Sequence, residues 1–219
     1  MAEIITAKQA AQKVEDGSTV MFGGFLASGA ALNVIDAIQE QGTKDLTVIS
    51  NDTGFVDRGI GKLIVNKQIS HVIASHIGTN KETGNQMNAG TTKVTLIPQG
   101  TLAEQIRAYG AGLGGILTPT GVGTPVAEGK QTLEINGKIY LLETALGADI
   151  AIIKAYKADK NGNLIYRHMG QNFNPMMATA AKTVIAEVEH IVEIGELDPD
   201  AIHTQGIFID YLVQTQEGK

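Results

Sequence analysis

The sequence predicts a mainly parallel α/β fold, and three features lead to this prediction. Short apolar stretches, bounded by glycine or polar residues, alternate with amphipathic stretches of helical period along most of the chain. The connections between apolar stretches are long enough for the crossover helices that parallel strands require. At 219 residues, a single domain spanning residues 1–219 is expected. We therefore expect an open sheet with helices on both faces.

The first elements follow one another closely. Thr6 and Gln9 match a capping box, which opens an amphipathic helix ending near Asp16-Gly17. A buried strand, a glycine-bracketed turn and a helix are then predicted at Thr19–Phe22, Gly23–Gly29 and Ala30–Gln41. Together these segments form a strand–loop–helix unit.

The alternation continues along the rest of the chain. Further buried strands are predicted at Leu46–Ser50, His71–Ser75, Val94–Ile97, Ile150–Tyr156 and Thr183–Val188. Thr101 and Glu104 match a second capping box, and a later helix is expected to start at Asn174 with Pro175 at its first position. Each of these two helices lies between two predicted strands, as a parallel sheet requires.

One segment departs from this pattern. Residues 131–142 alternate between apolar and polar around Asn136-Gly137, a dipeptide typical of two-residue hairpin turns. We expect a small antiparallel β-hairpin near 131–142. Glycine, at 26 residues, exceeds its usual share of roughly 7% and clusters at Gly110–Gly123. That cluster predicts a long flexible loop or a backbone surface near a ligand.

Composition excludes several function classes. The formal net charge of −6 and the lack of any Lys/Arg run argue against nucleic-acid binding. The chain has no cysteine, and no pair of its five histidines has the i, i+4 spacing of a helical zinc site, so no metal site is expected. Without a signal-peptide pattern or an apolar run of membrane-spanning length, we expect a soluble, cytoplasmic protein. Glu187, Glu189 and Glu193 alternate, which we interpret as a solvated face without a catalytic role.

The segment Gly23–Gly29 lies where open α/β sheets bind ligands, between a strand and the following helix. Its glycines permit close approach to the backbone, and free amides at the helix start favour an anionic or carbonyl oxygen. A plain tight turn explains the spacing equally well. Gly24 and Gly29 have P-loop spacing, but Ala30 and Ala31 replace the required Lys and Ser/Thr. The G-x-G-x-x-G fingerprint is also missing, so neither an NTPase nor a nicotinamide dehydrogenase is supported.

The same region resembles the first signature of the family I coenzyme A transferases. The match comprises Asp16-Gly17, the apolar triplet Val20–Phe22, Gly23-Gly24-Phe25 and Gly29, with Ala31 in place of the signature's final proline. Other segments resemble the alpha subunit of these enzymes: Ser50–Asp52, Ile60–Leu63, Ile73–Gly78, Pro98–Leu102, Thr118–Thr124, Asn172–Pro175 and Glu196–Asp200. Residues 51–55 and 74–80 are most similar to acetate/acetoacetate and butyrate/acetoacetate transferases.

This resemblance implies a mechanism and a partner. In the family, a glutamate of the beta subunit, within an S-E-N-G motif, attacks the acyl-CoA and then carries the CoA as a thioester. This chain has no such motif, and Glu134-Ile135-Asn136-Gly137, its nearest imitation, is explained by the predicted hairpin. No catalytic residue is therefore expected in this chain, and a beta subunit, in an α2β2 assembly, is the expected partner.

The resemblance also implies how this chain contacts its substrates. It assigns coenzyme A binding to Gly23, Gly24, Phe25, Leu26, Ala27, Ser28 and Gly29, through backbone amides that face the thioester or pantetheine region. Coenzyme A or acyl-CoA would enter as a substrate, with no permanently bound cofactor, and short-chain carboxylic acids would be the acceptors. Two alternatives stay open: a transferase for succinate and 3-oxoacids, and a non-catalytic acyl-CoA-binding module.

Overall fold

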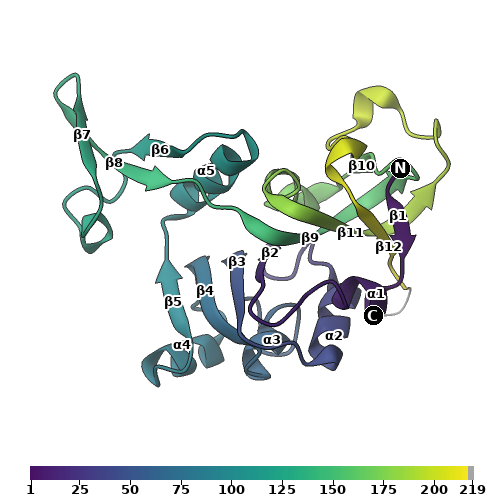
Figure 1. The fold of residues 1–219 in the computed structure, drawn as a ribbon, viewed down its shortest axis with the longest axis horizontal. Coiled ribbons are helices and arrows are strands. Elements are labelled where there is room, and N and C mark those ends of the chain that lie inside the picture. The colour runs from purple at the N-terminus through teal and green to yellow at the C-terminus, as the bar shows by residue number, and fades with distance from the viewer. Residues whose placement is uncertain (217–219) are drawn as a thin grey trace.

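The computed structural model describes residues 1–216 and contains one large sheet and one small sheet (Figure 1). All neighbouring strands in the main path of the large sheet are parallel, and β10 (Leu164–Ile165) pairs antiparallel with β9 at its side. The main path, in spatial order, is β1 (Glu3–Ile5), β12 (Tyr211–Gln214), β11 (Ala181–Val192), β9 (Ala148–Asp159), β2 (Thr19–Phe22), β3 (Leu46–Asp52), β4 (Ile69–His76) and β5 (Lys93–Leu96).

Helices cover both faces of this sheet, as predicted. The α-helices are α1 (Ala7–Ala11), α2 (Leu32–Gln41), α3 (Gly61–Val65), α4 (Lys81–Asn88), α5 (Gln99–Gly110) and α6 (Asn174–Met177). The short 3-10 helices are η1 (Pro125–Ala127), η2 (His168–Gln171), η3 (Pro199–Ala201) and η4 (Gly206–Phe208). One apolar core joins the sheet to α1, α2 and α3, and a second joins its other face to α5 and α6.

The period of the buried strands explains these two cores. Val20 and Phe22 of β2 belong to the core beneath α2, whereas Met21 between them belongs to the opposite core. All three side chains are at most 2% exposed. Because successive side chains of a strand point to opposite faces, a strand covered on both sides must be apolar throughout. The uninterrupted apolar run in the sequence is thus the mark of a central strand.

The first predicted helix is correct at its start but too long. Thr6 accepts a hydrogen bond from the Gln9 N–H (3.2 Å), and the Gln9 side chain accepts one from the Thr6 N–H (2.9 Å). The helix ends at Ala11, well before the predicted end at Asp16-Gly17. Asp16 instead accepts a hydrogen bond from the Lys44 N–H (2.7 Å), which ties this turn to the residues just before β3.

The second predicted capping box is wrong. Helix α5 starts at Gln99, with Pro98 as its N-cap, so Thr101 lies inside the helix. The Thr101 hydroxyl is buried and makes no hydrogen bond within residues 1–216. Glu104 pairs with Arg107 (2.6 Å) on the helix surface. Pro98, whose ring fixes a φ angle suited to a helix start, is the sequence signal that the capping-box pattern obscured.

The predicted hairpin is confirmed and belongs to a three-stranded antiparallel arm. Its strands are β6 (Gly115–Thr118), β8 (Lys138–Thr144) and β7 (Thr132–Ile135), in that order across the sheet. Asn136 and Gly137, with φ of 53° and 75°, form the two-residue turn. Glu134 is exposed on β7, so hairpin periodicity accounts for the Glu-Ile-Asn-Gly sequence.

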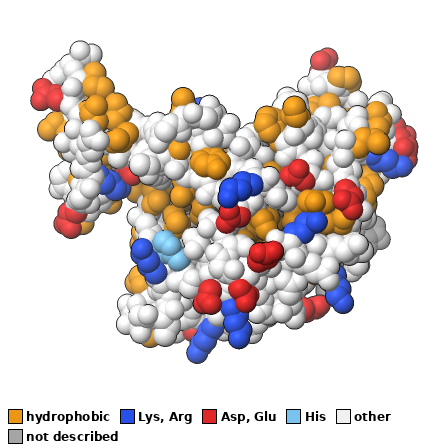
Figure 2. All heavy atoms as spheres, viewed as in Figure 1, with side chains coloured by type: hydrophobic (Ala, Val, Ile, Leu, Met, Phe, Trp, Pro, Cys, Tyr) orange, Lys and Arg blue, Asp and Glu red, His pale blue; other side chains and the backbone are white. Residues whose placement is uncertain are grey.

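The arm projects from the body of the molecule, and hydrophobic side chains gather on its surface (Figures 1 and 2). They include Leu117, Ile135 and Ile139, each more than a third exposed. The glycine-rich stretch 110–123 predicts a long flexible loop or a backbone surface near a ligand, and a long loop is wrong because the stretch contains the edge strand β6. No helix within residues 1–216 has the length and apolar character needed to cross a membrane.

Candidate functional site

The segment Gly23–Gly29 leaves the carboxyl end of β2, near the middle of the large sheet, and leads into α2. Phe22 is in register with Ile152 of β9 and Ser50 of β3. The Gly23 N–H donates to the Ile152 carbonyl (3.0 Å), which continues the pairing one residue beyond the strand. The segment therefore starts from a fixed point, as its sequence position predicted.

Within the segment, the backbone forms a tight turn with unusual dihedral angles. Phe25 and Ser28 exchange two backbone hydrogen bonds (3.0 and 2.8 Å), and the turn between them consists of Leu26 and Ala27. These two residues have φ of 47° and 69°, although neither is glycine. A left-handed conformation costs about 1–2 kcal/mol per ordinary residue. Such strain persists only where the surroundings fix the backbone, and it concentrates at functional sites.

Side chains from distant parts of the chain fix this backbone. Asp52, at the end of β3, accepts a hydrogen bond from the Leu26 N–H (3.0 Å). Asn172 accepts one from the Gly24 N–H and donates one to the Ser28 carbonyl, each at 3.1 Å. Asn174 donates to the Gly29 carbonyl (3.0 Å). The loop is thus held along its whole length by three side chains.

The glycines at the two ends of the segment are explained by contacts within the protein. A Cβ atom at Gly23 would lie 1.8 Å from Asn174 Oδ1, and one at Gly29 would lie 2.8 Å from Gly170 Cα. Gly24 has a φ of 120°, a conformation that other residues rarely adopt. Close packing of the loop against residues 170–174 therefore needs glycine whether or not a ligand binds.

Two backbone N–H groups of the segment have no acceptor among the described residues. The protein itself uses the N–H groups of the other five residues of the segment, at positions 23–26 and 28. The Ala27 and Gly29 N–H groups make no hydrogen bond within residues 1–216. Because N–H groups held in advance are suited to stabilising a developing oxyanion, these two are the candidates for contact with an acyl oxygen.

A second loop of the same design lies beside the first, and sequence reasoning missed it. Gly54–Gly59 repeats the Gly-Phe-x-x-x-Gly pattern of Gly24–Gly29, and it follows β3 as the first loop follows β2. Phe55 and Arg58 lie opposite each other in an antiparallel bridge, as Phe25 and Ser28 do, although with a single backbone hydrogen bond between them within the described residues, from the Arg58 N–H to the Phe55 carbonyl (3.3 Å). The signal was available as a six-residue pattern repeated after two consecutive predicted strands.

Asp52 joins the two loops. Its Oδ1 accepts from the Gly54 N–H (2.7 Å), while its Oδ2 accepts from the Leu26 N–H and from Asn51 Nδ2 (2.8 Å). The residue is only 5% exposed. One buried carboxylate thus satisfies donors of both loops, so a change at Asp52 affects both.

A polar hollow opens beside the first loop at the carboxyl ends of β3 and β4. Phe25, Asn51, Ser75, His76 and Gln99 contribute to its lining. Gln99 donates to Asn51 Oδ1 (2.6 Å), and Ser75 donates to the Asn51 carbonyl (2.7 Å). Amide and hydroxyl groups are therefore fixed where open α/β sheets bind ligands. Among residues 1–216, no three His, Asp or Glu side chains gather as metal ligands.

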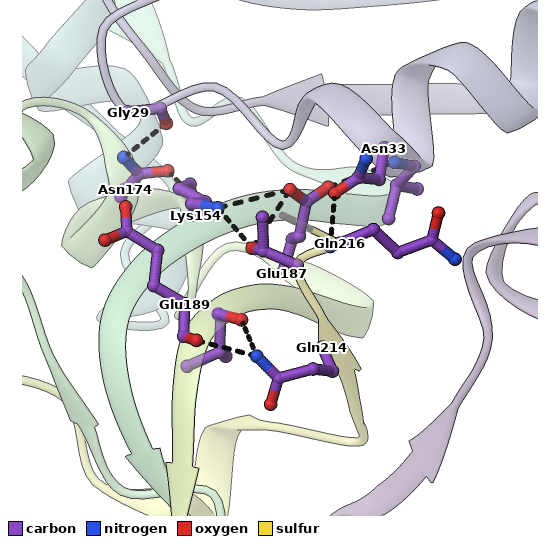
Figure 3. Close-up of polar contacts among 11 residues, drawn as sticks. Gly29, Asn33, Lys154, Asn174, Glu187, Glu189, Gln214 and Gln216 are labelled. Carbon is purple, nitrogen blue, oxygen red and sulfur yellow. Dashed lines mark hydrogen bonds and ion pairs between the residues drawn. The ribbon is translucent and has the colours of Figure 1, made fainter. Parts of the chain in front are cut away.

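On the other side of the loop, Glu187 contradicts the predicted solvated face. It lies on β11, between β9 and β12, and it is 1% exposed, whereas Glu189 is exposed. Figure 3 shows its carboxylate directed toward Lys154 and the start of α2. The alternation predicted that all three glutamates face solvent, but the strand is covered on both faces at Glu187.

Comparison with known proteins identifies the family of this chain. A family model described as Coenzyme A transferase matches residues 4–215. The alpha subunit of acetate CoA-transferase from Escherichia coli K12 is 53% identical over 217 residues, which cover 99% of each chain. The chain belongs to the coenzyme A transferase family.

Further relatives within the family differ in their named substrates. The acetoacetyl-CoA:acetate/butyrate CoA transferase alpha subunit of Clostridium acetobutylicum is 48% identical over 91% of this chain and 92% of its own. One subunit of a probable succinyl-CoA:3-ketoacid coenzyme A transferase from Bacillus subtilis is 51% identical over 95% of this chain and 87% of its own. Overall identity therefore does not separate the two substrate groups.

Solved structures show the same fold at low sequence identity. An acyl-CoA transferase (YdiF) from Escherichia coli O157:H7, in a thioester complex with CoA, has a TM-score of 0.88 and 22% identity. The match covers 100% of this chain and 48% of the YdiF chain, so this chain spans about half the length of YdiF. Glutaconate coenzyme A-transferase from Acidaminococcus fermentans has a TM-score of 0.87 and 18% identity, over 98% of this chain and 76% of its own. The predicted α/β architecture is thus the family's fold.

Proposed function

We propose that this chain is the alpha subunit of a heteromeric CoA-transferase that moves CoA between acetyl-CoA or butyryl-CoA and acetoacetate or another short-chain acid. The main support is the 53% identity with the alpha subunit of an acetate CoA-transferase over nearly the whole of both chains. The Clostridium acetobutylicum relative, named for acetoacetyl-CoA, acetate and butyrate, supports the same substrate class.

In this proposal, the two subunits divide the chemistry. The nucleophilic glutamate belongs to the beta subunit, because this chain lacks the S-E-N-G motif. The Gly23–Gly29 segment binds the acyl-CoA, and the free N–H groups of Ala27 and Gly29 donate to the acyl oxygen as negative charge develops on it. Coenzyme A enters and leaves as a substrate. An α2β2 assembly would place this segment opposite the partner's nucleophile.

Succinyl-CoA with a 3-oxoacid is the second candidate substrate pair, supported by the Bacillus subtilis relative. A second carboxylate favours an arginine, whose planar fork binds carboxylates with two hydrogen bonds. Arg107 is paired with Glu104, and Arg167 lies over the Tyr156 ring (4.9 Å). Arg58 forms no side-chain ion pair within residues 1–216, and it lies beside the first loop.

The test is a substrate panel on the complex reconstituted with its beta subunit. With acetoacetate as acceptor, kcat/KM should be higher for acetyl-CoA or butyryl-CoA than for succinyl-CoA. The reverse order would replace the first substrate assignment by the second. If the complex assembles correctly but no acyl-CoA donates its CoA, the chain would be a non-catalytic acyl-CoA-binding module. Light scattering of the same preparation checks the α2β2 stoichiometry.

A further inference from the structure

Behind the glycine loop, Glu187 forms a buried polar cluster that connects three elements (Figure 3). Its Oε2 accepts a hydrogen bond from the Val34 N–H (3.0 Å) in the first turn of α2. Its Oε1 contacts Lys154 Nζ of β9 (3.2 Å) and Thr215 Oγ1 (3.3 Å), which follows β12. The Glu187 and Lys154 side chains are 1% and 12% exposed. A carboxylate so deeply buried requires these partners.

Helix α2 depends on this carboxylate because it lacks a cap of its own. The first N–H groups of a helix have no partner inside the helix, and Ser, Thr, Asp or Asn usually supplies one. The N-cap here is Ala31, which has no side-chain acceptor. Glu187 supplies the missing acceptor from another strand, and its negative charge suits the positive end of the helix dipole.

The same cluster is connected to the glycine loop. Asn174 accepts a hydrogen bond from the Lys154 N–H (3.0 Å) and donates one to the Gly29 carbonyl (3.0 Å). Gly29 is separated from the first residue of α2 only by Ala30 and Ala31. The position of the first turn of α2 therefore limits where the last part of the loop can lie, together with Asn172 and Asn174.

We infer that Glu187 is a positioning residue for acyl transfer: it fixes the start of α2 and, through it, the Ala27 and Gly29 N–H groups. This inference rests on the proposed function of the Gly23–Gly29 segment. Glu187 does not contact substrate in this role. Its carboxylate is already bonded to Val34, Lys154 and Thr215. Its effect should therefore fall on kcat, with little change in KM for acyl-CoA.

Two double variants separate the capping contact from the ion pair. Glu187→Gln with Lys154→Met keeps an oxygen acceptor for the Val34 N–H and removes both charges. Glu187→Ala with Lys154→Met removes the same charges and the acceptor. Each variant would be combined with the beta subunit, then assayed well below its thermal midpoint. The Gln variant should keep kcat within about threefold of the parent, and the Ala variant should lose about tenfold or more, since misplaced oxyanion donors lower kcat.

Hydrogen exchange supplies a second measurement that does not depend on activity. Amides of residues 27–34 should exchange faster in the Ala variant than in the Gln variant, while amides of β4 exchange equally in both. If the Ala variant fails to fold, Glu187→Asn with Lys154→Met replaces it, because the shorter neutral side chain draws the acceptor away from Val34 and still removes both charges. Equal kcat and equal exchange in the two variants would overturn the inference.

The outcome is distinguishable from failure of the proposed function. Gly24→Val changes the loop directly and leaves Glu187 intact. If Gly24→Val loses turnover but the two double variants have equal kcat, only the role of Glu187 is overturned. If Gly24→Val keeps parental turnover, the loop does not take part in transfer, and the roles proposed for the loop and for Glu187 both fail, whereas absence of turnover in the parent complex would overturn the proposed function itself.

Discussion

The two Gly-Phe-x-x-x-Gly loops have the same sequence frame but different support. In the first, Phe25 and Ser28 exchange two backbone hydrogen bonds, and asparagines from residues 172–174 hold both ends. In the second, the only backbone bond across the turn runs from the Arg58 N–H to the Phe55 carbonyl (3.3 Å), within the described residues. Residues 55–58 are all exposed.

The backbone angles also indicate that the first loop is held more firmly than the second. The first loop has non-glycine residues with positive φ, Leu26 and Ala27, whereas in the second only the glycines at positions 54 and 59 have positive φ. Strained ordinary residues persist only where the surrounding structure over-determines them. The comparison supports our proposal that the first loop takes part in the chemistry, and that the second mainly supports it through Asp52.

The largest expected effect comes from Gly24→Val. Gly24 has a φ of 120°, and a Cβ there would lie 3.2 Å from the Ala30 Cβ, so valine should displace the loop backbone. Loss of an aligned oxyanion donor costs on the order of 10² to 10³ in rate. We expect kcat to fall by this factor. The thermal midpoint should fall only slightly, and the variant should still co-elute with the beta subunit.

Gly54→Val is the matched control for this prediction. Gly54 also has a positive φ, 63°, and its Cβ would lie 3.3 Å from the Arg58 carbonyl oxygen. The backbone strain should lower the thermal midpoint of both variants, but Gly54→Val should keep kcat within about tenfold of the parent because its loop is not held for chemistry. Equal losses of kcat in the two variants would remove the distinction between the loops.

Asp52→Asn should have an intermediate effect that reaches both loops. The Leu26 and Gly54 N–H groups bind different oxygens of the carboxylate, and asparagine retains only one oxygen. One N–H group would then face an amide donor inside the protein, which costs about 1–3 kcal/mol. Chemical denaturation should show this loss of unfolding free energy, together with a reduced kcat. Unchanged stability would show that the carboxylate is not needed to join the loops.

Arg58→Ala should have the smallest effect with acetyl-CoA and butyryl-CoA. The Arg58 side chain is exposed and forms no ion pair within residues 1–216. Surface substitutions of this kind usually change stability by less than about 0.5 kcal/mol. Steady-state assays should give parental kcat and KM for these donors. A selective rise in KM for succinyl-CoA would instead assign Arg58 to a second carboxylate.

Local sequence pattern predicted the strands closest to the site and the confirmed hairpin. Thr19–Phe22 has the predicted limits because a glycine turn follows directly, and Asn136-Gly137 fixed the hairpin turn. Contacts between distant residues were not predictable in this way. Asn172 and Asn174 reach the loop from the far end of the chain, and no spacing rule identifies them as its supports.

Burial at the sheet centre also escaped the sequence analysis. Alternating glutamates usually indicate a solvated face, but the first turn of α2 packs against Glu187 on its face of the sheet. The short strands β1, β10 and β12 were missed because each is brief, and β1 and β12 also pair with each other from opposite ends of the chain. Pattern alone does not reveal which strand a short segment will join.

The division of chemistry between subunits is tested most directly by assaying CoA transfer with the purified chain alone and after mixing with its beta subunit. The chain has a supported loop with two available N–H donors, but its sequence has no S-E-N-G motif to provide the nucleophile. We predict no transfer by the chain alone and robust transfer by the mixture. Robust turnover by the chain alone would contradict this account.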